Sequence, residues 1–136
     1  MPTEKVRIGW LRFMYIVTAI VAGGCGLAIL IMPEAGQWLS DVAGPRVVSG
    51  IVGSVYIAFG LLSILGLYNP LKFAPILLLQ MVYKAVWLVG VIVPMLIDGA
   101  ISTGMIPLIA VFVLIVAGDI VAIPFRMLFL RDSHDK

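Results

Sequence analysis

Lys84 is the residue whose type and position most directly indicate chemistry. It lies in the middle of an apolar stretch of membrane-spanning length, within the segment QMVYKAVW that covers residues 80–87. A cation at the centre of a transmembrane helix costs roughly 2.5 to 3.5 kcal/mol on insertion scales, so it normally has a partner, a water-filled cavity or a ligand. The sequence is therefore expected to place one of these next to Lys84.

The same segment carries four polar or amphipathic side chains at the spacing i, i+3, i+4 and i+7: Gln80, Tyr83, Lys84 and Trp87. Residues at this spacing are neighbours on one side of a helix. If this side met lipid, an amide, a phenol, an ammonium and an indole N–H would all lack partners, which is costly for each group. This face is therefore predicted to point into a helical bundle.

The elements that position these side chains are predicted from composition and from the length of the apolar stretches. Of the 136 residues, 62% are hydrophobic and 12% are charged, against roughly 25% charged in soluble domains. Four apolar stretches each reach the roughly 20 residues that cross a hydrocarbon core of about 30 Å. The sequence predicts one all-α domain over residues 1–136, an integral membrane four-helix bundle with helices at about 6–32, 46–68, 71–97 and 105–130.

The connection between the first two predicted helices is too polar to cross a membrane. Residues 33–45 read PEAGQWLSDVAGP. The Trp38-Leu39 pair, with acidic residues on both sides, is typical of a short amphipathic helix that lies in the membrane interface. A short interfacial helix is therefore predicted between the first and second spans.

Basic residues predict how the four spans are oriented, because Lys and Arg accumulate in the cytoplasmic loops and ends. With four crossings, the side opposite the termini holds only Arg46. The side of the termini holds all the other basic residues outside the spans' centres: Lys5, Arg7, Arg12, Lys72, Arg126, Arg131 and Lys136. Both termini are predicted to be cytoplasmic.

Small residues indicate where the helices approach one another. Ala22 and Gly26 are four residues apart in the first helix. Gly50, Ser54 and Ala58 recur every four residues in the second helix. Small side chains let helix backbones approach closely in lipid, so both sets are predicted to pack against neighbouring helices.

The height of a residue in the membrane follows from its distance to the nearest hairpin turn, because antiparallel helices rise about 1.5 Å per residue. The turn between the third and fourth helices is centred near Ile101, which places Asp119 within one residue of the level of Lys84. The preceding turn, centred near Pro70, places Tyr56 opposite Lys84. A buried ion pair between Lys84 and Asp119 is predicted, with Tyr56 at the same level.

Two interpretations of this pair are open. It is either an ion pair that only fixes helix register and adds little net stability, or part of a site that binds a polar or anionic group or relays a proton. The neighbouring donors and flat rings favour the second interpretation. Alternatively, Asp119 pairs with Arg126 or Arg12 and leaves Lys84 uncompensated, in which case a neutral amine is available as a nucleophile toward a carbonyl.

Other kinds of site are excluded or weakly supported. The single cysteine, Cys25, excludes an internal disulfide and a cysteine-built metal site. The single histidine, His134, lies in the polar tail, so no imidazole pair is available inside the bundle for haem or a metal centre. No metal site is predicted, and the sequence identifies no cofactor. The net charge of +2 comes from basic residues at the ends of membrane segments, so nucleic-acid binding is not predicted.

Two local motifs resemble a known family. An arginine followed by glycine near the start, Arg7-Ile8-Gly9, and a glycine-punctuated second helix, GIVGSVYIAFGLLSILGL over residues 50–67, stand in a layout of four short-looped helices. This combination resembles the DoxX-like group of small bacterial membrane proteins over the first half of the chain. The resemblance implies a helical bundle in the bacterial inner (cytoplasmic) membrane. The group includes subunits of membrane oxidoreductases that work with quinone, and no functional residue is carried over from it.

The leading functional hypothesis is a midplane site that binds a small polar or amphipathic ligand, with transport as one use of it. Lys84 would supply the positive charge and Asp119 would balance it. The predicted ligand-binding residues are Lys84, Asp119, Gln80, Tyr83, Trp87 and Tyr56.

Two alternatives belong to other functional classes. One is an accessory or structural subunit whose polar face meets the helices of a partner membrane protein. The other is an enzyme, or an enzyme subunit, that acts on a lipid or a quinone. A homo-oligomer is also compatible with the sequence, since four thin helices enclose little volume.

Overall fold

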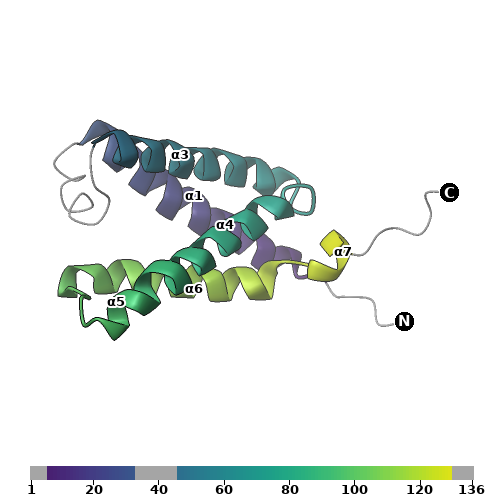
Figure 1. Cartoon of the computed structure of the whole chain (residues 1–136). Coiled ribbons are helices and arrows are strands. Elements are labelled where there is room, and N and C mark those ends of the chain that lie inside the picture. The colour runs from purple at the N-terminus through teal and green to yellow at the C-terminus, as the bar shows by residue number, and fades with distance from the viewer. Residues whose placement is uncertain (1–5, 33–45, 130–136) are drawn as a thin grey trace.

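Four helices in the structure are long and apolar enough to cross a membrane. The computed structural model describes residues 6–32 and 46–129, which contain helices and turns and no strand (Figure 1). The four candidate spans are Ile8–Ile31, Val48–Tyr68, Ala74–Ile97 and Thr103–Ala122. The chain is thus an all-α integral membrane protein, as predicted. The short interfacial helix predicted over residues 33–45 lies outside the described residues.

The four spans form two antiparallel hairpins that cross each other (Figure 1). The helices are α1 (Ile8–Ile31), α3 (Arg46–Tyr68), α4 (Ala74–Trp87), α5 (Val93–Ile97), α6 (Ile106–Ala122) and α7 (Phe125–Phe129). The first hairpin is α1 with α3, and the second is α4 and α5 with α6. The indole Nε1 of Trp10 donates to the carbonyl oxygen of Gly118 at 3.1 Å, so the start of α1 lies beside the last part of α6.

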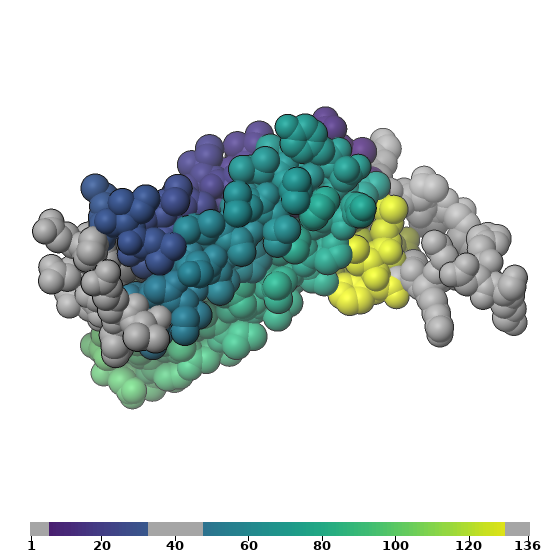
Figure 2. All heavy atoms as spheres, turned by 90° about the horizontal axis from the view of Figure 1, so that it is seen from above, coloured from purple at the N-terminus to yellow at the C-terminus, as the bar shows by residue number. Residues whose placement is uncertain are grey.

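Glycines allow α1 and α3 to pack along their length, as the space-filling view also shows (Figure 2). A Cβ atom on Gly26 would lie only 2.6 Å from the carbonyl oxygen of Gly53, and one on Gly60 would lie 2.8 Å from the Cα of Gly23. Real side-chain atoms do not approach backbone this closely, so these positions require glycine. The predicted contact of Gly26 with a neighbouring helix is therefore confirmed.

The predicted packing stripe on α3 is on the wrong face. Ser54 and Ala58 are exposed, and a Cβ on Gly50 would meet no atom within 4 Å. The face that contacts α1 is instead the one with Gly53 and Gly60. Small residues occur on both faces of α3, and spacing alone does not tell which face meets the partner helix.

The third span changes its helical type just before Pro94. α4 passes into a π-helical turn, Leu88–Ile92, and then into α5. In this turn the N–H of Val93 donates to the carbonyl of Leu88, five residues back. Proline lacks an N–H and disturbs the regular helical ladder, and a wider turn of this kind is one way in which helices adapt.

The fourth span ends earlier than predicted. α6 stops at Ala122, and Ile123 is extended, with φ −72° and ψ 125°. The residue before a proline is disfavoured in the helical region, so Pro124 ends the helix. The short α7, Phe125–Phe129, follows. The single helix predicted over about 105–130 is therefore divided at Pro124.

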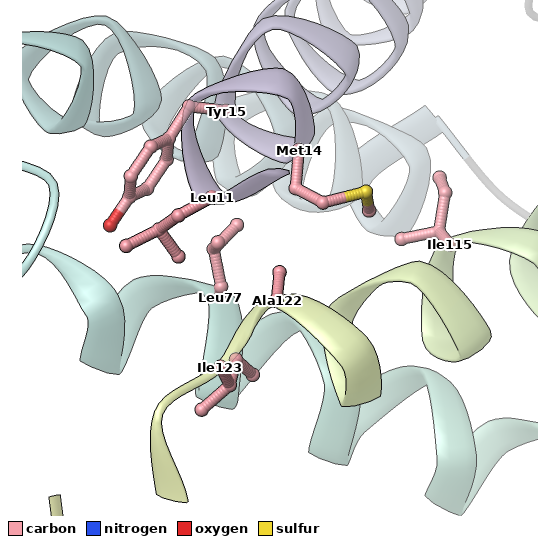
Figure 3. Close-up of a cluster of buried hydrophobic side chains, with 7 residues drawn as sticks. All are labelled: Leu11, Met14, Tyr15, Leu77, Ile115, Ala122 and Ile123. Carbon is pink, nitrogen blue, oxygen red and sulfur yellow. The ribbon is translucent and has the colours of Figure 1, made fainter. Parts of the chain in front are cut away.

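A cluster of buried apolar side chains joins the two hairpins near the N-terminal end of α1 and the C-terminal end of α6 (Figure 3). Its members are Leu11, Met14, Tyr15, Leu77, Ile115, Ala122 and Ile123. The hydroxyl of Tyr15 donates to the carbonyl oxygen of Pro70 at 2.7 Å. Tyr15 therefore fixes α1 against the turn between α3 and α4, and the cluster sets how the second hairpin crosses the first.

The α1–α3 contact predicts a large difference between two neighbouring glycines. Gly26→Ala should destabilise the protein by about 1–3 kcal/mol, because the new methyl group forces the two backbones apart. Gly24→Ala is the matched control on the same helix, since a Cβ there meets no atom within 4 Å. Thermal unfolding of the purified proteins in detergent measures both, and equal melting temperatures for the two variants would show that the contact is not as close as described.

Candidate functional site

Lys84 is buried in the middle of the third span without an acidic partner. Its side chain is 2% exposed. Among residues 6–32 and 46–129 the structure contains no ion pair, so the predicted salt bridge between Lys84 and Asp119 is not formed. Pairing of Asp119 with Arg126 or Arg12 is absent for the same reason, and both arginines are exposed. Lys84 and Asp119 act on each other only at longer range.

Aromatic rings take the place of the missing carboxylate around Lys84. The Nζ atom donates a hydrogen bond to the hydroxyl of Tyr83. It lies 4.3 Å from the ring centroid of Tyr83, 4.8 Å from that of Phe112 and 5.9 Å from that of Tyr56. The electron-rich faces of such rings attract a cation. The predicted approach of Tyr56 to Lys84 is therefore observed, and the cation has three rings and one hydroxyl around it.

Asp119 is bound by Gln80 instead of Lys84. The Nε2 of Gln80 donates to the Oδ2 of Asp119 at 3.1 Å and to the Oγ1 of Thr18 at 3.0 Å. The Thr18 hydroxyl in turn donates to the carbonyl oxygen of Met14 at 2.8 Å. Gln80, Asp119 and Thr18 are each 0% exposed. One amide group thus joins α4 to both α1 and α6 in the interior of the bundle.

The register of the second hairpin explains why Asp119 misses Lys84. Across this hairpin Gln80 donates to Asp119, and Trp87 packs against Phe112. Both pairs are symmetric about the peptide between Gly99 and Ala100, not about Ile101. Gly99 has a φ of +67°, a backbone conformation that glycine adopts without strain, and it makes the tight turn there. The shift moves Asp119 about one helical turn away from Lys84 and toward Gln80.

A cavity of about 150 Å³ lies beside Lys84 and is lined by residues of all four spans. Four of the lining residues are polar, namely Thr18, Tyr56, Gln80 and Lys84, but nearly all of the cavity surface is apolar. The α6 residues that line it, between Pro107 and Ile115, are apolar, as are Val21 and Ala22 of α1. The small side chain of Ala22 leaves room for the cavity at this level of α1.

Two acceptor atoms of the site have no partner within the described part of the chain. These are the Oε1 of Gln80 and the Oδ1 of Asp119, both fully buried. A buried polar group without a hydrogen bond is costly, so each is an open position for a donor. The Oε1 belongs to a side chain that lines the cavity, and Gln80 and Lys84 are both almost completely buried beside it.

The remaining predicted site residues have supporting positions. Tyr83 accepts from Lys84 and packs against the ring of Phe59, with 5.4 Å between the ring centroids. Its hydroxyl is within hydrogen-bonding reach of Tyr56. Trp87 packs edge-on against Phe112, with 5.0 Å between the ring centroids. Trp87 is therefore behind the cavity wall, while the rings that surround the Lys84 cation are those of Tyr56, Tyr83 and Phe112.

Thr18, which binds Gln80, and Phe112, which lies beside Lys84, were not among the predicted site residues. Thr18 is one of few polar residues in the first half of α1, and that isolation in an apolar run was a usable signal. Phe112 gave no signal, because it lies in a wholly apolar segment. In residues 6–32 and 46–129 no group of three His, Cys, Asp or Glu side chains could hold a metal ion.

No family model, curated protein or solved structure matches this chain. The resemblance to the DoxX-like group therefore stays a prediction.

The bridging amide of Gln80 predicts a strong effect of its removal on stability. Gln80→Leu deletes the donor to Thr18 and Asp119 and leaves a buried carboxylate without partners, which should destabilise the protein by about 1–3 kcal/mol. Ser54→Ala is the control, because the Ser54 hydroxyl is exposed and donates only to Gly50 of its own helix. The measurement is unfolding in detergent monitored by circular dichroism.

A double variant distinguishes the loss of the Gln80 hydrogen bonds from the effect of the different side-chain shape of leucine. Gln80→Leu combined with Asp119→Leu removes the stranded carboxylate as well, so the double variant should recover part of the lost stability. A single Gln80→Leu variant as stable as the wild type, or a double variant with additive losses, would contradict the bridging role.

Proposed function

We propose that this integral membrane protein binds a small polar or amphipathic ligand in the cavity at the middle of its four spans. The observation that carries the proposal is Lys84, a cation that is 2% exposed, lacks an ion-pair partner in the described part of the chain and lines an open cavity. An intramembrane ionisable residue that faces a cavity is typical of a binding or transport pathway.

The purely structural interpretation of Lys84 is weakened by the same geometry. An ion pair that only fixes helix register needs a close carboxylate and no empty space. Here the nearest acid on α6 accepts from Gln80, and the space next to Lys84 is a cavity. Replacing buried charged groups by apolar side chains of similar volume is often neutral or stabilising, so packing alone does not account for a lysine here, and a ligand that needs the charge is the better account.

In the proposed site, Lys84 donates a hydrogen bond to an oxygen of the ligand. Gln80 accepts a hydrogen bond from the ligand or orients it. Tyr56 and Tyr83 hold the ammonium group between their rings, while Trp87 supports Phe112 from behind. Asp119 balances the charge of Lys84 from about one helical turn away. Transport is one use of such a site, because a midplane site is equally far from both membrane surfaces.

A second candidate function, an accessory subunit of a membrane complex, is favoured by the outer face of α3. Ser54 and Ala58 are exposed there beside Gly50, which has open space around it. Small residues of this kind let another helix approach closely. The partner in this proposal is another membrane protein or a second copy of the chain, and the contact does not involve the inward-facing Lys84.

We also propose that both termini are cytoplasmic and that the protein resides in a bacterial inner membrane. The described basic residues support this orientation, since Arg7, Arg12, Lys72 and Arg126 would share the cytoplasmic side with the termini. Arg46 would lie on the other side.

The binding proposal is tested by comparing compounds that co-purify with the wild type and with Lys84→Met. Organic extracts of the two purified proteins are analysed by mass spectrometry. We expect at least one compound at near-stoichiometric amount in the wild type and at least tenfold less of it in Lys84→Met. Lys72→Met, at an exposed position, is the matched control and should retain the compound. Equal extracts from wild type and Lys84→Met would contradict the proposal.

The orientation is tested with reporter fusions. A green fluorescent protein at the C-terminus should fluoresce, and alkaline phosphatase at the same position should be inactive, because the first folds in the cytoplasm and the second outside it. Alkaline phosphatase inserted after Ile101, in the turn between α5 and α6, should be active. The reverse pattern at both positions would show that the basic residues do not set the topology.

A further inference from the structure

The side chains that line the cavity limit the ligand to a narrower class of compounds than the charge of Lys84 alone does. Most of the lining consists of apolar side chains of α1 and α6, among them Val21, Leu108, Val111 and Ile115. A strongly hydrated anion such as phosphate would exchange its water shell for these hydrocarbon surfaces and gain partners only at one end. Desolvation without compensating hydrogen bonds is unfavourable, so the ligand must itself be largely apolar.

Almost all of the cavity surface is apolar, so the buried Gln80 and Lys84 that line it can serve only one small polar group. The Nζ of Lys84 carries up to three N–H donors, and the hydroxyl of Tyr83 accepts one. The Oε1 of Gln80, one helical turn away on the same face, is buried and has no partner in the described part of the chain. A carboxyl group fits this pair, because its oxygens accept from Lys84 and, when it is protonated, its O–H donates to Gln80.

The size of the cavity limits the apolar part of the ligand. An apolar cavity of about 150 Å³ is large enough to take up benzene, and this cavity has a volume of about 150 Å³. A long acyl chain does not fit inside it. The ring of Phe112, which lies 4.8 Å from Nζ, presents a flat apolar surface beside Lys84.

The mouth of the cavity is also apolar. Among the lining residues, Cys25 of α1 and Pro107 and Val111 of α6 are exposed, and none of them is charged. In a protein that spans a membrane, such a mouth between two helices meets hydrocarbon. An apolar acid partitions into the bilayer and can enter by this route, whereas a small polar anion is excluded from it.

We infer that the ligand is a small monocarboxylic acid with an apolar body of about benzoate or hexanoate size, bound with its carboxyl group at Lys84 and its body toward Cys25. This inference rests on the proposed function and specifies its ligand. It assigns Lys84 and Gln80 to the carboxyl group and the α6 wall to the hydrocarbon part.

Cys25 provides the measurement, because it is the only cysteine of the chain and lies exposed at the mouth. A bound acid should cover its thiol. The rate of Cys25 alkylation by N-ethylmaleimide is followed by intact-protein mass spectrometry in detergent, with and without millimolar benzoate or hexanoate. We expect each acid to slow alkylation at least threefold in the wild type and to have no effect in Lys84→Met, while Lys72→Met behaves like the wild type.

Two comparison probes separate the roles of the carboxyl group and the apolar body. Benzyl alcohol keeps the ring without the carboxyl group, and lactate keeps the carboxyl group with almost no apolar body. Both should protect Cys25 at least fivefold less well than benzoate. Melting temperatures measured with the same probes provide a readout that does not depend on the thiol, and benzoate should raise that of the wild type but not that of Lys84→Met.

The outcomes distinguish this inference from the proposed function. If lactate protects as well as benzoate, the site binds polar anions and the apolar-acid inference is wrong, while the proposed ligand site is retained. If no probe protects Cys25 or shifts the melting temperature, the inference is overturned as well. The proposed function then depends on the compound extracted from wild type but absent from Lys84→Met.

Discussion

The amide group of Gln80 is the interaction on which the interior of this bundle depends. Hydrocarbon offers no hydrogen bonds, so a polar group inside the spans must find its partner on another helix. The two N–H groups of Gln80 reach Thr18 of α1 and Asp119 of α6. Since α1 is also packed closely against α3 through glycines, this amide fixes the crossing of the two hairpins at one height.

That arrangement leaves Lys84 without its expected acid. Cation–π contacts contribute roughly 2 kcal/mol when they are desolvated, against roughly 2.5 to 3.5 kcal/mol for a cation at the centre of a span. The rings of Tyr83 and Phe112 and the hydroxyl of Tyr83 therefore offset most of the insertion cost. A protein can keep such a lysine without a ligand, and a ligand oxygen adds the stabilisation that a carboxylate would otherwise supply.

The sequence was sufficient for the features that depend on hydrophobicity and on the cost of burying polar groups. The four spans, the inward face with Gln80 and Lys84, and the approach of Tyr56 were all predicted correctly. The two wrong predictions concern the exact position of a turn and the choice of helix face. A turn centred at Gly99 instead of Ile101 moved Asp119 by about one helical turn, and the α3 stripe around Ser54 faced outward because small residues occur on two sides of that helix.

The apolar residues of the site could not be predicted from the sequence. A polar side chain in a span is informative, because lipid exposure would cost free energy and the residue must therefore point inward. An apolar side chain such as Phe112 carries no such information, since it is equally stable against lipid, against another helix or against a cavity. Whether it lines the site depends on helix rotation and register, which packing at Gln80 and at the glycines decides. The polar residues of the site can thus be predicted from the sequence, whereas its apolar lining can be identified only from the three-dimensional structure.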